Sequence, residues 1–142
     1  MGYEKQGFAR TYNNRRETLE IGGQVCNFRS QLEKKVAQYL EVLRVGGHIK
    51  SWSFETTTFQ FPDDKWLVDF DIRNNDDTFE YYEAKGMFDA RARRKLKLVA
   101  KYRPDAKITM VFQNKRDMQK ARLSRKYAHR FCLLSELTKG IV

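Results

Sequence analysis

The sequence has few cysteines and no long apolar run, and both shortages limit what the protein can be. Cys26 and Cys132 are its only cysteines in 142 residues, and they stand far apart without the spacing of metal ligands. This excludes a disulfide framework and a zinc ribbon. No apolar run approaches the roughly 20 residues that span a bilayer. These absences predict one globular domain in a reducing compartment, with no part in a membrane.

Targeting signals are also missing. The N-terminus has no apolar core of a signal peptide, and Gln6 stands where a myristoylation motif has Ser or Thr. We therefore expect a cytoplasmic protein.

Acidic residues are in the minority. There are 28 Lys and Arg against 18 Asp and Glu, which gives a formal net charge of +10 and a sequence pI near 9.7. Such a balance favours a polyanionic partner, with nucleic acid first and an anionic membrane surface second. Simple solubility is the plainer alternative.

Hydrophobic periodicity predicts a small α/β domain. Residues 1–27 are polar and lack a sustained period, so we expect a basic, flexible arm, followed by one domain over residues 28–142. A helical stripe from Ser30 ends at Gly46-Gly47, and residues 49–61 are typical of strands. A second helix begins after Asp89, a buried strand covers 107–112, and the basic segment 113–130 is either a helix or a partly ordered loop. The order predicts helices around a small mixed sheet.

Residues 66–85 predict a β-hairpin that gathers carboxylates. Apolar and polar residues alternate up to the turn at 74–77, and the return strand ends at Lys85. This turn places Asp69 opposite Glu83 on one face, with Lys85 beside them. Two facing carboxylates destabilise a sheet unless a cation lies between them, and Mg²⁺ prefers such oxygen ligands. An ordinary surface ion pair between Lys85 and Glu83 is the alternative.

Several motifs in this order resemble the phage endonuclease I family, the Holliday-junction resolving enzymes of T-odd phages in the PD-(D/E)xK nuclease superfamily. They are "FRSQLEKKV", an Asp-Phe on the first hairpin strand, "YYEAKG", a basic helix before a proline, and "ITMVF". The resemblance implies a restriction-endonuclease-like PD-(D/E)xK core. It also implies a Mg²⁺-dependent endonuclease, with Mn²⁺ as a substitute, that cuts branched DNA in the host-cell cytoplasm.

The resemblance also implies the site residues. Asp69 and Glu83 bind metal together with the Ala84 carbonyl, Lys85 contacts water or phosphate, and Glu33 completes the catalytic set. Glu33 has a structural alternative, because Ser30-Gln31-Leu32-Glu33 is a capping-box pattern. The family's proline before the metal-binding Asp is Val68 here, and Pro62-Asp63 makes Asp63 a competing ligand.

Partners follow from the same resemblance. Family members form intertwined dimers, so the resemblance implies a homodimer with domain swapping. Basic residues flanking the site are expected to contact the DNA backbone. They are Arg29, Arg91, Arg93, Arg94, Lys95, Lys115, Arg116, Lys120, Arg122, Arg125 and Lys126. The alternatives are a related nuclease acting on other DNA and a DNA-binding protein that does not cut.

Overall fold

Helices separate groups of one to three strands along the chain. The computed structural model describes residues 16–139. In chain order its elements are β1 (Glu17–Ile21), β2 (Gln24–Phe28), α2 (Gln31–Val45), β3 (Ser51–Phe61), β4 (Asp64–Arg73), β5 (Phe79–Lys85), α3 (Ala90–Tyr102), β6 (Ile108–Phe112), α4 (Lys115–Lys120), the 3₁₀ helix η1 (Arg122–Tyr127), β7 (Arg130–Leu133) and α5 (Leu134–Leu137).

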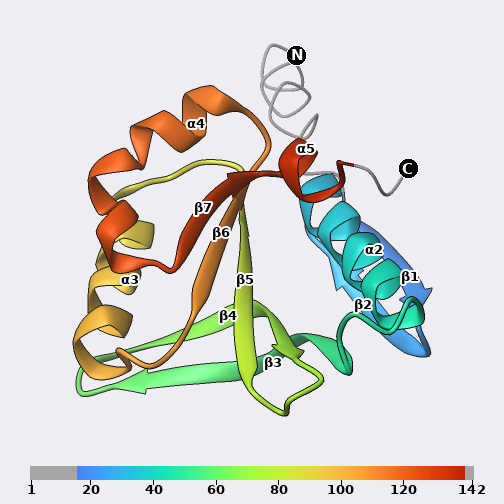
Figure 1. Cartoon of the computed structure of the whole chain (residues 1–142). Coiled ribbons are helices and arrows are strands. Elements are labelled where there is room, and N and C mark those ends of the chain that lie inside the picture. Colours follow the sequence, from blue (N-terminus) through green and yellow to red (C-terminus); the bar gives the residue numbers. More distant parts are fainter. Residues whose placement is uncertain (1–15, 140–142) are drawn as a thin grey trace.

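A five-stranded mixed sheet forms the centre of the molecule. Its strand order is β3-β4-β5-β6-β7. The first three strands are antiparallel, whereas β6 and β7 run parallel to β5. In Figure 1, α2 and α5 lie to one side of the sheet, and α3 and α4 lie to the other. The predicted α/β fold with a small mixed sheet and flanking helices is confirmed.

The β4–β5 hairpin has the register that its turn residues predict. Phe70 pairs with Tyr82 and Asp71 with Tyr81. The next residues along the two strands, Asp69 and Glu83, therefore face each other.

Two hydrophobic cores fill the space between the sheet and its helices. The first joins α2 to the sheet through residues such as Phe70 and Ile72, and the second joins α3 to it through residues that include Trp66 and Val68. The alternation in 66–72 predicted that these four residues share one face. All four are buried, but they divide between the two cores, and the β4–β5 ladder covers only Phe70 to Arg73.

The N-terminal segment corrects one prediction. Residues 17–28 form the β1–β2 hairpin, which turns at Gly22-Gly23 and contacts α2. Cys26 and Phe28 of this hairpin are buried in the first core. The prediction of a flexible arm is therefore wrong for residues 17–27, and the rest of that arm lies outside the described residues.

Side-chain caps fix where the two long helices begin. The Ser30 hydroxyl accepts the Glu33 N–H at 3.1 Å, and the Asp89 carboxylate accepts the Ala92 N–H at 2.9 Å. Each satisfies a backbone donor that the first helical turn leaves free.

The basic segment 113–130 is ordered as α4 and η1. Ala121 between them is buried in the second core, and Arg93 of α3 donates to the Ser124 hydroxyl of η1 at 3.3 Å. No helix among residues 16–139 is both long and apolar enough to cross a membrane.

Candidate active site

A polar pocket lies between the β3–β4–β5 strands and α3. Its volume is about 560 Å³, and it is lined by charged residues of several elements. They include Arg29, Asp69, Glu83, Lys85, Arg91 and Lys95. The hairpin carboxylates Asp69 and Glu83 thus share one hollow with Lys85 and with three of the predicted DNA-contacting residues.

Asp69 and Glu83 are locked together by backbone hydrogen bonds. Glu83 Oε1 accepts the Asp69 N–H at 2.9 Å, and Asp69 Oδ2 accepts the Ala84 N–H at 2.8 Å. Only 3% of Asp69 and 6% of Glu83 is exposed. One oxygen of each carboxylate is therefore fixed by the sheet, which leaves the other oxygen for a cation.

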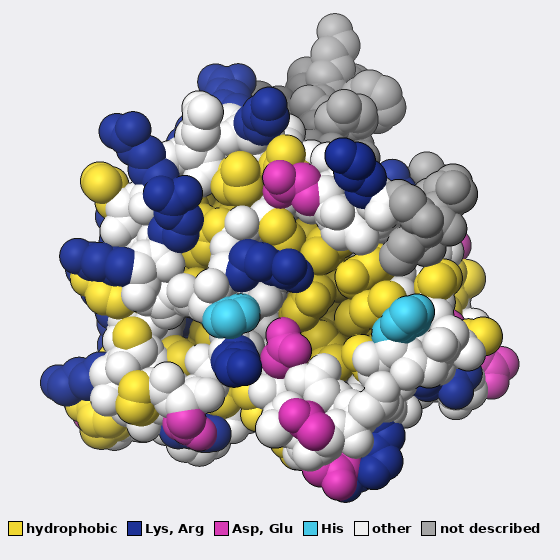
Figure 2. Space-filling view, in the orientation of Figure 1, with side chains coloured by type: hydrophobic (Ala, Val, Ile, Leu, Met, Phe, Trp, Pro, Cys, Tyr) yellow, Lys and Arg dark blue, Asp and Glu magenta, His cyan; other side chains and the backbone are white. Residues whose placement is uncertain are grey.

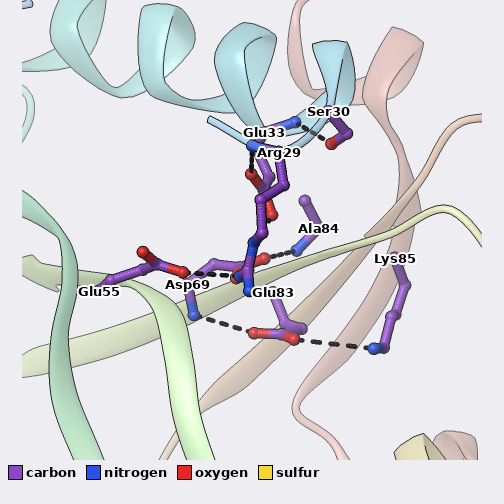
Figure 3. Close-up of polar contacts among 8 residues, drawn as sticks. All are labelled: Arg29, Ser30, Glu33, Glu55, Asp69, Glu83, Ala84 and Lys85. Carbon is purple, nitrogen blue, oxygen red and sulfur yellow. Dashed lines mark hydrogen bonds and ion pairs between the residues drawn. The ribbon is translucent and has the colours of Figure 1, made fainter. Parts of the chain in front are cut away.

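Glu33 joins these two carboxylates from the start of α2 (Figure 3). Its Oε1 accepts the Arg29 N–H at 2.7 Å, and its side chain is buried. Ser30 caps the helix, as the capping-box alternative predicts, and Glu33 accepts the N–H of Arg29, the residue before the cap. The Glu33 side chain therefore binds the backbone at the start of α2 and also lies close to Asp69.

Arg29 lies among the carboxylates, as Figure 3 shows. Its guanidinium NH2 atom is 2.6 Å from Glu55, 3.6 Å from Glu33 and 3.7 Å from Asp69. The oxygens of Glu33 and Asp69 that face Arg29 are those not bound to backbone N–H groups. Arg29 thus offsets negative charge that the buried carboxylates would otherwise leave uncompensated.

Lys85 approaches the cluster from the other side. Its Nζ atom is 4.0 Å from Glu83 Oε2, and 30% of its side chain is exposed. At this distance the pair is a loose ion contact, because hydrogen bonds from nitrogen are near 2.9 Å. The ammonium therefore remains available to a ligand in the pocket.

The electrostatics of the cluster favour a proton or another cation. Burial, reinforced by the charge of Glu83, raises the pKa of Asp69 well above its usual range. Burial raises the pKa of Glu83 to about 7 in spite of the nearby Lys85. Burial likewise raises the pKa of Glu33, although its backbone hydrogen bond and Arg29 oppose the shift.

The donor set fits a hard divalent cation that the protein holds with few ligands. Among residues 16–139 no group of three or more His, Cys, Asp and Glu side chains could hold a metal ion. Mg²⁺ in nucleotide-processing sites is commonly bound by one or two carboxylates, with water and phosphate oxygens as its other ligands. Asp69 and Glu83 each present one oxygen of this kind, so the residues fit such a cation.

The remaining acids of the hairpin region have structural contacts. Asp63 is exposed in the turn between β3 and β4. Asp76 accepts the Thr78 N–H, and Asp77 pairs with Lys50 at 2.7 Å. Asp71 accepts hydroxyl hydrogen bonds from Ser53 and from Thr57, the latter at 2.8 Å. It therefore holds β3 to β4 beside the site.

The predicted DNA-contacting residues fall into three groups. Arg29, Arg91 and Lys95 line the pocket. Arg94 and Lys95 bind the Asp64 carboxylate, and Arg93 binds η1. The others are exposed on α4 and η1: Lys115, Arg116, Lys120, Arg122, Arg125 and Lys126. Figure 2 shows Lys and Arg side chains gathered over α4.

Sequence reasoning missed Glu55. This residue lies in the β-bulge between Phe54 and Thr57, and its φ of 56° is unusual outside glycine. Its strand-like neighbours gave no signal of a bulge. Lys65 was missed as well, although it lines the pocket.

Comparison with known proteins gives a match to a family model. The sequence model of a family described as phage endonuclease I matches residues 15–137, which is most of the chain. No curated protein and no solved structure matches the chain at the threshold applied.

Proposed function

The chain belongs to the phage endonuclease I family and is thus an endonuclease acting on DNA; from its site we propose that it is a divalent-metal-dependent enzyme that cuts branched DNA, resolving four-way Holliday junctions. We assign its core to the PD-(D/E)xK superfamily, with Asp69, Glu83 and Lys85 as the signature residues.

One observation carries this proposal. Glu33, Asp69 and Glu83 are buried, and each accepts a backbone N–H hydrogen bond with one carboxylate oxygen. The other oxygen of each faces Arg29 or Lys85. They do so at a pocket whose rim also carries Arg91 and Lys95. A local negative cluster within a basic surface suits a cation that brings an anionic substrate to the protein.

Asp69 and Glu83 would hold Mg²⁺ or Mn²⁺, with the Ala84 carbonyl as a further candidate ligand, and Glu33 would complete the catalytic set beside them. When bound, the ion supplies Lewis-acid activation of water and neutralises charge on the phosphate. The hydrogen bonds that Asp69 and Glu83 accept from the backbone orient their carboxylates before substrate arrives.

Lys85 contributes a mobile ammonium beside the reacting groups. Hydrolysis forms a bond from a water oxygen to phosphorus and breaks the bond to a deoxyribose oxygen. Negative charge increases on the phosphate oxygens as this happens, and a nearby ammonium stabilises it by donating hydrogen bonds. Lys85 is half-buried next to Glu83, so it can orient the water or contact the phosphate.

The proposal is tested with an immobile four-way DNA junction and a linear duplex of the same sequences, each with Mg²⁺ and then with chelator. We expect symmetry-related cuts in the junction that disappear with chelator. Cutting of both substrates at equal rates would point to a nuclease of other specificity, and a junction that is bound but stays whole would point to a DNA-binding protein.

Arg91 is expected to contact a DNA phosphate. It is exposed at the N-terminal end of α3 and lines the pocket, so Arg91→Gln should weaken binding of all sequences alike. The slope of log affinity against log salt should fall by about 1. Filter binding across a salt series measures both. Lys35→Gln, on the exposed side of α2, is the matched control; an unchanged slope for Arg91→Gln would contradict the contact.

Two cuts in one junction require two active sites, so we propose a homodimer. Within a single chain Arg29 lies near both Glu33 and Asp69, so each protomer of such a dimer carries the residues of one site. Sedimentation of the metal-free protein at micromolar concentration is expected to give about twice the chain mass of 16.9 kDa. A single species of the chain mass would contradict the dimer.

A further inference from the structure

Glu55 is the one acidic residue at the cluster to which the proposed chemistry assigns no role. We propose that Glu55 is a positioning residue: by holding the Arg29 guanidinium, it keeps the free oxygen of Asp69 open to the divalent cation. This inference rests on the proposed function, because it presumes that the carboxylates bind a metal.

The distances around Arg29 show which carboxylate holds it. Its NH2 atom donates to Glu55 Oε2 at 2.6 Å, a short charge-assisted hydrogen bond. The same atom is 3.6 Å from Glu33 Oε2 and 3.7 Å from Asp69 Oδ1, which is beyond hydrogen-bond length. Arg29 therefore compensates the charge of both catalytic carboxylates without being hydrogen-bonded to those two oxygens.

The backbone is bent to present Glu55 in this place. Glu55 has a φ of 56°, in the left-handed region, and sits in the bulge where the β3–β4 register shifts. The bulge is anchored by Asp71, which accepts hydrogen bonds from the hydroxyls of Ser53 and Thr57 on either side. A strained conformation held by its surroundings is typical of functional sites.

Fold stability alone explains this arrangement poorly. The Arg29 side chain is 54% exposed and that of Glu55 is 26% exposed. Ion pairs with this much contact to solvent contribute little to the free energy of folding, whereas a left-handed glutamate costs conformational energy. The strain is better explained by the position that Glu55 gives to Arg29.

Removal of Glu55 should bring Arg29 and the metal into competition. Without its hydrogen-bond partner, the guanidinium has Glu33 and Asp69 as its nearest carboxylates. It can then donate directly to these carboxylates, including the free oxygen of Asp69 that a cation needs, since guanidinium and carboxylate form strong paired hydrogen bonds. Removal of Arg29 should have the opposite effect, because the competitor is gone.

Binding of Mn²⁺ to the DNA-free protein tests the inference without any cleavage assay. Free Mn²⁺ is followed by electron paramagnetic resonance for the wild type, Glu55→Gln, Arg29→Met and the double variant. We expect Glu55→Gln to bind about tenfold more weakly and Arg29→Met to bind more tightly than the wild type. In the Arg29→Met background, Glu55→Gln should change the affinity by less than about threefold.

The matched control is Arg44→Met, which removes the same charge from the far end of α2, where Arg44 pairs with Glu41. It should leave the affinity for Mn²⁺ close to that of the wild type. Thermal unfolding in chelator verifies that each variant is folded.

Three outcomes overturn the inference, and they have different meanings. If Glu55→Gln binds Mn²⁺ like the wild type, Glu55 has no role at the site. If it weakens binding equally with and without Arg29, Glu55 acts on the metal itself and not through Arg29. If the wild type binds no Mn²⁺ at millimolar concentration, the proposed metal dependence fails as well. In the first two cases the proposed function is untouched.

Discussion

Replacement of Lys85 by Met is expected to slow junction cleavage by about 10³-fold while leaving junction affinity within about threefold of the wild type. Lys85 is the cation next to Glu83 on the catalytic face, and its Nζ atom is only loosely paired there at 4.0 Å. The ammonium is thus free to act where charge develops in the transition state. Methionine keeps most of the side-chain volume and removes only the charge and the hydrogen-bond donors.

Single-turnover cleavage in Mg²⁺ and binding in chelator measure the two effects separately. Lys35→Met is the control, since Lys35 is an exposed lysine of α2 that does not line the pocket. Cleavage at the wild-type rate by the Lys85 variant would mean that the chemistry lies elsewhere. An equal loss of binding and cleavage would make Lys85 a DNA-binding residue instead.

Replacement of Asp69 by Asn should abolish cleavage and also raise the free energy of unfolding of the metal-free protein at pH 8. Burial raises the pKa values of Asp69 and Glu83 above those of an unfolded chain. In the pH range between the pKa values of the unfolded chain and the pKa of about 7 for Glu83 in the folded protein, the native state binds more protons than the unfolded state. The stability contributed by these groups is therefore present at low pH and lost as pH rises through that window.

Chemical denaturation in chelator at pH 5.5 and pH 8 measures this effect. The difference between wild type and Asp69→Asn isolates the site, because the other titrating groups are common to both proteins. We expect the advantage of the variant to be larger at pH 8, and Mg²⁺ to stabilise the wild type but not the variant. A variant less stable than the wild type at pH 8 in chelator would show that the charge of Asp69 is already compensated.

The parts of the site that share one hairpin could be predicted from the sequence. Strict alternation and a strong turn determine the register of two adjacent strands, so the facing positions of Asp69 and Glu83 followed from local rules. Glu33 was different, because its local pattern gave it a capping role. Only the resemblance of its motif to a family motif predicted it in the site. In the structure Glu33 accepts the Arg29 N–H and also faces the Arg29 guanidinium.

The features that could not be predicted depend on residues distant in sequence. The bulge that presents Glu55 is held by Asp71, which lies on the neighbouring strand, and nothing in "SFETTTF" marks it. The division of the buried residues in 66–72 between two cores involves α2 and α3, which are distant from β4 in sequence. The β1–β2 hairpin did carry a local signal. Gly22 and Gly23 both have positive φ, as two-residue hairpin turns require, but the short strands around them are too polar to show a clear period.

The most direct test of the whole account is cleavage of a supercoiled plasmid that extrudes a cruciform, which contains a four-way junction. We predict that the wild type with Mg²⁺ converts it to linear DNA through paired cuts at the cruciform, and that chelator or Asp69→Asn leaves it supercoiled. Cleavage that persists in chelator, or a plasmid that is bound at the cruciform and never cut in Mg²⁺ or Mn²⁺, would contradict a metal-dependent junction-resolving site built on Asp69, Glu83 and Lys85.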